Sequence, residues 1–309
     1  MSITSGSWRE LPPLAIARSH SPVVPYQGKL YIFGGGGPDF KSLDSVVCYD
    51  PATDQWQDLA PMPTRRSGTA AFLADDKIYL VGGGFKKADG NFQFLHTVEI
   101  YDPASDTWSS GVDMLQPHDY PAATELDGWF YILGGHHPEA CLGGPKTDPG
   151  FDFCERWRPG EPAWQAIATL PTPRFAAAAV SHGGRILTSG GVAFRPEGFN
   201  NFDFFESYDP ASDGWQREAE LKLPWPAAGH VMCAVDDGLL FIGGFSTDNI
   251  HARAAYYDMN EQRWHRLPDM PLPRAAMGAA IIDQTLYLVG GWADDGRTPM
   301  NSVVAYHWG

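Results

Sequence analysis

The segment Ser67-Gly-Thr-Ala-Ala-Phe-Leu-Ala-Asp-Asp-Lys-Ile-Tyr-Leu-Val-Gly-Gly83 decides the fold, together with Thr97-Val-Glu-Ile-Tyr-Asp102 and Trp108 further on. Its short apolar runs are rich in β-branched and aromatic residues and are bounded by turn residues, which is typical of β-strands. Pro103 stands at the second position of the turn 102–107, where its fixed φ suits a β-turn. The segment predicts strands at 67–74, 77–81 and 97–101, and an outer strand that begins at Trp108.

The same pattern occurs six times, with 47 to 56 residues between successive Gly-Gly pairs. The pairs begin at Gly34, Gly82, Gly134, Gly190, Gly243 and Gly290. The matching tryptophans are Trp8, Trp56, Trp108, Trp164, Trp215 and Trp264. From the second tryptophan on, each has an aromatic residue seven positions before it. A period near 50 with glycine and aromatic markers predicts a β-propeller, in which we expect the tryptophans to pack between neighbouring blades.

The two ends of the chain complement each other. The last repeat runs through Leu286-Tyr-Leu-Val-Gly-Gly291 and Val303-Val-Ala-Tyr306 and has no outer strand after it. The first residues, Ser7-Trp-Arg-Glu-Leu11, have the character of an outer strand with no blade in front. We therefore expect the N-terminal strand to complete the last blade, which would remove an exposed sheet edge.

The repeat resembles the Kelch repeat in Ile78-Tyr-Leu-Val-Gly-Gly83, Val98-Glu-Ile-Tyr-Asp102, Trp108 and Met114. Pro61-Met-Pro-Thr-Arg-Arg66 is similar to the arginine-bearing link between Kelch blades. The resemblance implies an all-β fold: a six-bladed β-propeller with four-stranded antiparallel blades, forming a single domain over residues 1–309. The expected blades are 15–62, 63–114, 115–170, 171–223, 224–270, and 271–309 together with 4–13. The third repeat departs from the pattern at Trp157-Arg158, and the fifth lacks the linking arginine.

Bulk properties exclude several classes of partner. The formal net charge of −15 argues against nucleic acid and anionic membranes. No run of 18 apolar residues is present, and the start lacks the basic and apolar regions of a signal peptide. The four cysteines, Cys48, Cys141, Cys154 and Cys233, favour a reduced, cytoplasmic protein.

Arginines recur at one position of the repeat, sixteen residues before the first glycine of each pair. The six residues there are Arg18, Arg66, His118, Arg174, Ala227 and Arg274. If the repeats superpose, these side chains surround the propeller axis. The guanidinium fork suits a carboxylate or phosphate, so the arginines predict a site for an anion. The alternative is that each arginine braces a neighbouring loop.

The third repeat has His118-Asp-Tyr120 where others have Arg-Ser, and its loop after the glycine pair is the longest. His118, Asp119 and Tyr120 are candidates for acid–base catalysis, because histidine titrates near neutrality. Against this, adjacent residues on an extended chain point apart, so that bracing of a loop is the alternative role.

Six further residues are expected around the same site. The candidate ligand-binding residues are His136, Phe175, Arg195, His230, Phe245 and Trp292. Phe245 and Trp292 directly follow glycine pairs and could equally cover their own loops. His136, His137, Cys141 and Cys154 are metal ligands in type, but their spacing matches no zinc pattern, and neither a metal nor a cofactor is expected.

These observations predict recognition of an anionic, carboxylate-bearing small molecule or an acidic peptide in the central mouth of the propeller. The first alternative is a small-molecule enzyme of the isomerase, mutarotase or cyclase type, because stand-alone Kelch propellers include such enzymes. It would use His118 or Tyr120 for proton transfer. The second alternative is a scaffold for protein–protein interaction.

Overall fold

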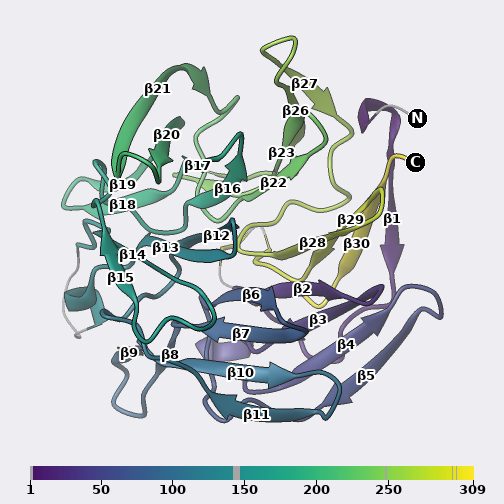
Figure 1. Cartoon of the computed structure of the whole chain (residues 1–309). Helices are drawn as coiled ribbons and strands as arrows, with labels where there is room; N and C mark the ends of the chain where they lie inside the picture. The colour runs from purple at the N-terminus through teal and green to yellow at the C-terminus, as the bar shows by residue number, and fades with distance from the viewer. Residues whose placement is uncertain (1–2, 142–146, 248, 294, 297) are drawn as a thin grey trace. The chain divides into compact units, whose positions relative to one another are not determined.

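The computed structural model describes residues 3–141, 147–247, 249–293, 295–296 and 298–309. The chain forms two compact units. We call Met1–Ser67 with Gly229–Gly309 the terminal unit, and Gly68–Ala228 the middle unit. Each unit contains three four-stranded antiparallel sheets, whose strands are labelled in Figure 1.

The terminal unit holds the first, fifth and sixth blades. The first is β2 (Val23–Tyr26), β3 (Lys29–Phe33), β4 (Val46–Asp50) and β5 (Gln55–Leu59). The fifth is β22 (Val231–Val235), β23 (Gly238–Ile242), β26 (Ala254–Asp258) and β27 (Arg263–Leu267). The sixth is β28 (Gly278–Ile282), β29 (Thr285–Val289), β30 (Val303–His307) and β1 (Ser7–Leu11). This unit also has a hairpin of β24 (Phe245–Ser246) and β25 (Asn249–Ile250), and the 3-10 turns η1 (Ile3–Ser5) and η2 (Pro38–Phe40).

The middle unit holds the second, third and fourth blades. The second is β6 (Ala70–Ala74), β7 (Lys77–Val81), β10 (Val98–Asp102) and β11 (Thr107–Ser110). The third is β12 (Ala122–Leu126), β13 (Trp129–Gly135), β14 (Phe151–Trp157) and β15 (Gln165–Ile167). The fourth is β16 (Ala178–His182), β17 (Arg185–Ser189), β20 (Phe204–Asp209) and β21 (Gly214–Lys222). Two hairpins, β8 (Gly84–Lys86) with β9 (Phe92–Phe94) and β18 (Val192–Arg195) with β19 (Gly198–Asn201), and the 3-10 turn η3 (Pro138–Cys141) complete it.

The predicted fold class is confirmed: the chain is an all-β, six-bladed β-propeller with four-stranded antiparallel blades. The N-terminal strand is the outer strand of the sixth blade, as expected. It pairs with β30 in a register that runs from Ser7 opposite His307 to Leu11 opposite Val303. No helix among the described residues is long and apolar enough to cross a membrane.

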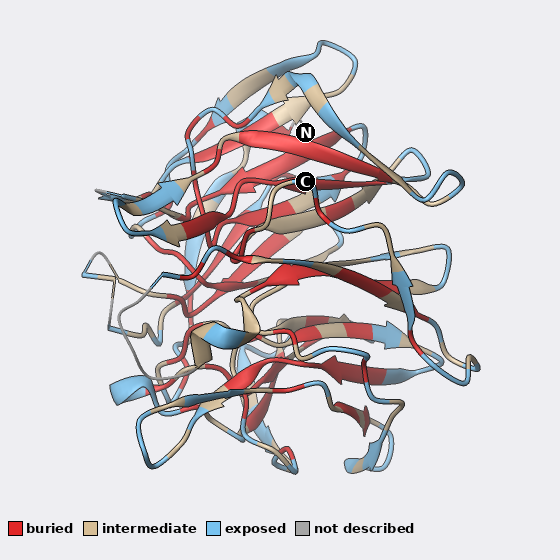
Figure 2. Ribbon diagram, turned by 90° about the vertical axis from the view of Figure 1, so that its left-hand side faces the viewer, coloured by how far each residue is buried: buried red, intermediate tan, exposed pale blue. Residues whose placement is uncertain are grey.

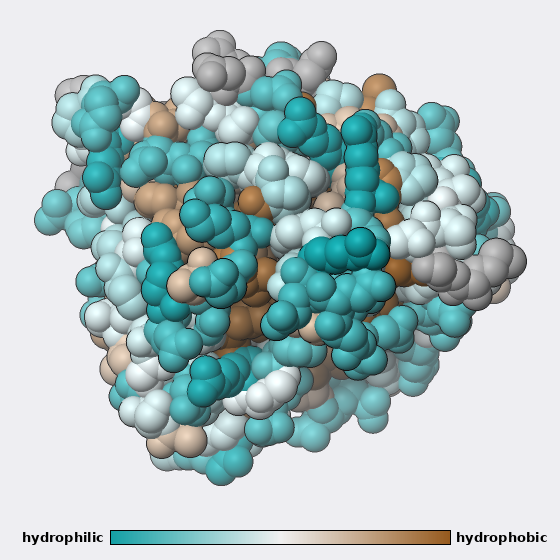
Figure 3. Space-filling view, turned by 90° about the horizontal axis from the view of Figure 1, so that it is seen from above, coloured by the Kyte–Doolittle hydropathy of each residue, from teal (hydrophilic) through white to brown (hydrophobic). Residues whose placement is uncertain are grey.

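Buried side chains concentrate along the blades. Figure 2 shows buried residues on the strands and exposed residues mainly in the turns that join them. In the terminal unit the core includes Leu240, Ile242 and Leu288, each fully buried. In the middle unit Val81, Phe130 and Ile132 occupy comparable positions. Figure 3 shows a mainly hydrophilic face on which smaller groups of hydrophobic side chains lie between polar ones.

Each marker tryptophan packs against the aromatic residue of its own blade. The ring centroids of the pairs Tyr49–Trp56, Tyr101–Trp108, Trp157–Trp164, Tyr208–Trp215, Tyr257–Trp264 and Tyr306–Trp8 lie 4.8 to 5.9 Å apart. Four of the indoles also donate a hydrogen bond to a carbonyl just beyond the outer strand of a neighbouring blade. These bonds are Trp8 to Pro268, Trp56 to Pro12, Trp164 to Val112 and Trp215 to Ala168, at 2.8 to 3.0 Å. The tryptophans therefore tie blades together, as predicted.

A second tie lies at the inner end of each blade, where one residue has a positive φ. The six residues are His20, Gly68, Tyr120, Ala176, Gly229 and Ala276, with φ between 52° and 62°. In the middle unit the N–H of Tyr120 donates to the carbonyl of Gly68, and that of Ala176 to Tyr120. In the terminal unit Ala276 donates to Gly229, and His20 to Ala276. The left-handed conformation is unfavourable for residues with a side chain, so these bonds offset a local strain.

Removal of the N-terminal strand tests how far the sixth blade depends on it. Deleting residues 2–13 exposes the edge of β30 and removes the Trp8 hydrogen bond to Pro268. We expect aggregation or a melting temperature lower by several degrees, measured by size-exclusion chromatography and calorimetry. The control is Ser7→Ala, an exposed position of the same strand. A truncated protein that remains monomeric with an unchanged melting temperature would contradict this role.

Candidate functional site

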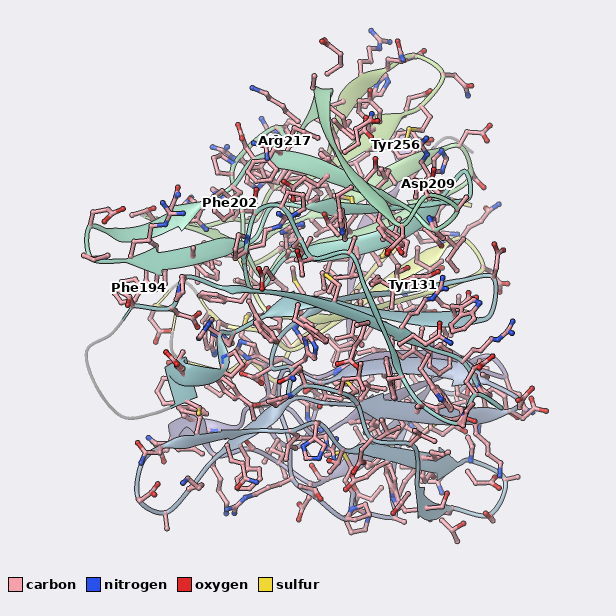
Figure 4. All side chains as sticks on the ribbon, turned by 60° about the vertical axis from the view of Figure 1, so that its left-hand side comes forward. Tyr131, Phe194, Phe202, Asp209, Arg217 and Tyr256 are labelled. Atoms are coloured by element: carbon pink, nitrogen blue, oxygen red, sulfur yellow. The ribbon has the colours of Figure 1, made fainter. Side chains whose placement is uncertain are left out.

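A cavity of about 270 Å³ lies in the middle unit, at the end of the blades that carries the hairpins β8–β9 and β18–β19. The residues that line it are Phe92, Phe94, Asp119, His136, Ala140, Thr147, Asp148 and Phe194. They come from β9, the link before β12, the residue after β13, η3, the loop before β14, and β18. Figure 4 labels Phe194 on the β18–β19 hairpin. The cavity therefore lies among loops and hairpins that extend beyond the four-stranded blades.

Three ionisable side chains, those of Asp119, His136 and Asp148, line the cavity. The Nδ1 of His136 and the Oδ2 of Asp148 are 2.5 Å apart, and the Nε2 of His136 lies 3.9 Å from the Oδ2 of Asp119. The other oxygen of Asp148 accepts the N–H groups of His137 and Gly150, at 3.1 and 3.0 Å. All three side chains are largely buried, with exposed fractions of 26% for His136, 13% for Asp119 and 11% for Asp148. Asp148 is thus well supplied with donors, whereas the contact of Asp119 with His136 is longer than a hydrogen bond.

The protonation of this group follows from its surroundings. Burial raises the pKa of the Asp119 carboxyl from 3.8 to about 6. Burial opposes the charge of His136, but the hydrogen bond with Asp148 and the charge of Asp119 outweigh burial and raise its pKa above the ordinary value. Burial also opposes ionisation of Asp148, and the bonded His136 nevertheless holds its pKa below the ordinary value. At neutral pH both carboxyls are therefore mostly ionised, and they favour the protonated form of His136 that lies between them.

Aromatic rings hold the imidazole in place. The ring of Phe175 stacks on His136 with centroids 4.0 Å apart, and the ring of Phe94 stacks at 5.9 Å. Asp119 packs against backbone, since a Cβ added to Gly68 or Gly84 would lie 2.6 or 3.2 Å from its Oδ1. The absence of side chains at these two glycines lets the carboxylate approach so closely.

The four arginines predicted to bind an anion are buried: Arg18, Arg66, Arg174 and Arg274 are each 1% exposed or less. Arg18 donates to the carbonyls of Gly34 and Ser45 and to the Ser45 hydroxyl. Arg274 repeats the arrangement with Gly290 and Ser302. Burial lowers the pKa of both arginines to about 10.

The other two arginines are likewise directed into the protein. Arg174 donates to Glu206 at 2.5 Å and to Thr188, and Arg66 Nε donates to the carbonyl of Thr64. The guanidinium groups of Arg18, Arg174 and Arg274 donate to groups of their own unit, and all four arginines are closed off from solvent. Their binding of an anion remains a prediction without a supporting contact.

His118 occupies the arginine position of the third repeat and acts in the same way. Its Nδ1 donates to the carbonyl of Gly134, sixteen residues on, as Arg18 does to Gly34. Its Nε2 lies 3.1 Å from Glu155, which also accepts the N–H groups of Leu115 and Gln116. The ring is 0% exposed, so that His118 is a brace and does not reach the cavity.

The three candidate catalytic residues, His118, Asp119 and Tyr120, have different surroundings. Asp119 lines the cavity, whereas His118 points into the protein toward Glu155. Tyr120 has a positive φ, and burial raises the pKa of its hydroxyl, which keeps it protonated. His118 is thus separated from the cavity that Asp119 lines, whereas the charge of Asp119 is a second cause of the raised Tyr120 pKa.

The remaining predicted residues are distributed over both units. In the middle unit His136 lines the cavity, Phe175 stacks behind it, and Arg195 is exposed at the end of β18. In the terminal unit His230 is buried with its ring 4.9 Å from Phe241, and Phe245 is half-buried on β24. Trp292 packs edge-on against His20 at 4.5 Å.

Several residues of the cavity were not predicted from the sequence. Asp148, Thr147 and Ala140 lie in the long loop after His136, and Phe92, Phe94 and Phe194 lie on the two hairpins. Asp89-Gly90 followed by Phe92-Gln-Phe94 is a local hairpin signal that is independent of the repeat. The described residues around Cys141 and Cys154 gather no metal-ligand set: Cys141 contacts the carbonyl of Pro138, and Cys154 is fully buried on β14.

Truncation of a buried arginine tests the bracing role. Arg274→Ala leaves the carbonyls of Gly290 and Ser302 without their donor inside the protein. We expect the free energy of unfolding to fall by about 3 kcal/mol, measured by denaturant titration. The matched control is Arg266→Ala, whose side chain is 77% exposed and pairs with Asp269, and which should change stability by less than about 0.5 kcal/mol. Equal effects of the two substitutions would contradict the bracing role.

Substitution of Asp119 tests its protonation. Because the pKa is about 6 in the folded protein and 3.8 ordinarily, the folded state holds the proton more tightly, and Asp119 destabilises the fold progressively as pH rises through this window. We therefore expect Asp119→Asn to raise the melting temperature by a few degrees near pH 8 and to leave it unchanged near pH 4. Asp113→Asn, at a side chain 52% exposed, is the control and should show no such gain. A loss of stability near pH 8 in Asp119→Asn would refute the assignment.

Comparison with known proteins identifies Kelch repeats in this chain. Residues 151–306 match the KLHDC2/KLHL20/DRC7 Kelch-repeats domain, and residues 17–63 and 65–115 match the Kelch motif. Kelch-like protein 25 of Xenopus tropicalis is 27% identical over 195 residues, which cover 63% of this chain and 32% of that protein. Kelch-like protein 23 of Homo sapiens is 28% identical over 217 residues, covering 70% and 36%. The chain thus spans about a third of the length of these two relatives.

Among solved structures, the one titled "Structure of YjhT" aligns with a TM-score of 0.80 over 95% of both chains, at 18% sequence identity. At that identity the likeness shows the fold alone. The family models match residues 17–63, 65–115 and 151–306, and the match over 151–306 alone covers half of the chain. The chain therefore belongs to the Kelch-repeat family.

Proposed function

We propose that this protein is a binding module whose ligand enters the cavity of the middle unit. Binding of a ligand or a protein is the class of function that membership of the Kelch-repeat family supports. The observation that carries the proposal is the combination of aromatic walls with Asp119, His136 and Asp148 in one concave site. Apolar pockets with a few convergent polar groups are the usual form of small-ligand sites.

The energetic cost of the site favours a function over a purely structural role. A partly buried carboxylate with a raised pKa destabilises the fold when it is ionised. The buried side chains that brace the rest of the middle unit do not involve Asp119. Groups that cost stability in this way are concentrated at binding and catalytic sites. Asp119 is such a group, and it faces the cavity.

An enzyme that uses the same cavity is the second candidate. Asp119 has a pKa of about 6, and the pKa of His136 is raised above its ordinary value, so both can exchange protons near neutrality. An isomerase or cyclase would then rely on Asp119 and His136, since His118 is closed off in the core. Turnover of a bound compound that is lost in His136→Gln with binding retained would distinguish an enzyme from a binding module.

The anionic ligand predicted from the sequence has weaker support. Three of the arginines expected to hold it, Arg18, Arg174 and Arg274, donate to groups of their own unit, and the eight described residues that line the cavity include neither arginine nor lysine. A scaffold for protein partners is compatible with the family, and it requires no cavity.

A thermal-shift screen tests the proposed cavity. Anionic, neutral and cationic compounds of fewer than about fifteen heavy atoms should include some that raise the melting temperature of the protein. The variant Ala140→Trp fills the cavity from η3 and should abolish these shifts. Ala104→Trp, in the exposed turn between β10 and β11, is the matched control and should retain them. Shifts that persist in Ala140→Trp, or a screen in which no charge class gives one, would overturn the proposal.

A further inference from the structure

We propose that the cavity of the middle unit recognises an organic cation, an ammonium or guanidinium group, through the Asp119 carboxylate between aromatic walls. The inference rests on the proposed function and deepens it by naming the chemistry of the ligand. The inferred ligand is positively charged, whereas the arginines in the sequence predict a negatively charged ligand.

The charge of the lining is the first argument. Two carboxylates and one imidazole carry a net charge of −1 when all three are ionised, and no lysine or arginine lines the cavity among the described residues. The single positive group, His136, already shares its Nδ1 with Asp148. An incoming anion would meet two carboxylates and one cation that is already paired, whereas an incoming cation would neutralise the excess charge.

The contacts of Asp119 are the second argument. Its Oδ1 lies against the backbone of Gly68 and Gly84, and its Oδ2 is 3.9 Å from His136. Within the described part of the chain, neither oxygen accepts a hydrogen bond, and its pKa reflects burial and charge alone. Among the described residues, the Asp119 carboxylate therefore lacks the hydrogen-bond donors that stabilise a buried charge. An ammonium or guanidinium group would supply them.

The walls are the third argument. Phe92, Phe94 and Phe194 line the cavity together with Asp119, and Phe94 and Asp119 both lie against Gly84. Aromatic faces attract cations and do not attract anions, because the ring quadrupole is negative above its plane. The formal net charge of −15 adds a long-range attraction for cationic ligands. The cavity, of about 270 Å³, has room for the head group of a small amine or of a basic side chain.

Three probes of one size and different charge separate the possibilities: n-butylammonium, butyramide and butyrate. We expect calorimetry to show that n-butylammonium binds most tightly and butyrate most weakly. Asp119→Asn should weaken the binding of n-butylammonium by about ten-fold and leave that of butyramide nearly unchanged. Because this variant is expected to be more stable than the parent protein, lost binding would not reflect unfolding. Asp113→Asn removes the same charge from an exposed site and should retain binding.

Two results distinguish this inference from the proposed function. If butyramide or butyrate binds at least as well as n-butylammonium, and Ala140→Trp abolishes that binding, the cavity is a ligand site and the preference for cations is wrong. If Ala140→Trp leaves the binding of all three probes unchanged, the proposed site itself is wrong.

The same chemistry could belong to a free amine or to a lysine or arginine side chain of another protein. The peptides Gly-Lys-Gly and Gly-Arg-Gly, with blocked ends, distinguish these sources when compared with n-butylammonium and methylguanidinium. Tighter binding of a peptide by about ten-fold would assign the source to a protein, and equal binding would assign it to a small amine. In both cases Asp119→Asn must weaken binding, and a variant that binds like the parent protein would overturn the role of Asp119.

Discussion

The tie between one blade and the next is the constraint on which the rest of the structure depends. A four-stranded sheet has two edges and little core of its own, so it gains stability by packing against its neighbours. In each unit an indole N–H reaches a carbonyl just beyond the outer strand of a neighbouring blade, and a residue with positive φ donates to the corresponding residue at the inner end. The blades are thus held at both ends, and they fix the positions from which the loops leave.

The buried cations belong to the same system. Arg18, Arg274 and His118 each donate to the carbonyl of a glycine sixteen residues further on, and these glycines have φ of 48°, 59° and 65°. The positive φ turns the carbonyl inward, where a buried donor must meet it. Arg18 and Arg274 are therefore internal braces of their blades, and their binding of an anion stays a prediction. Asp119 and the long loops are not part of these repeated bracing contacts, and they are therefore the candidates for a functional role.

Much of the fold could be predicted from the sequence because its signals are local and repeated. The glycine pairs, the seven-residue spacing to Trp108 and Trp215, and the displaced strand at 7–11 led to the observed blades and to the pairing of the first strand with the last. The site was harder to predict for a physical reason. Periodicity shows that Arg18 and Arg274 are equivalent, but it does not show whether a side chain meets solvent or a carbonyl. Asp148 and Phe94 contact His136 only in the folded structure, so no spacing in the sequence predicts these contacts.

His118 and Asp119 show how structural and binding roles are separated by one residue. Both residues depart from the repeat pattern. The departure at His118 has a structural explanation, because its Nε2 contacts the carboxylate of Glu155 inside the core. The neighbouring side chain points the other way, into the cavity, because successive residues of an extended chain face opposite sides. A departure from a repeat is therefore not by itself a sign of function. The stronger sign is a charge for which the fold supplies no hydrogen-bond donor, and in the described lining of this cavity that charge is Asp119.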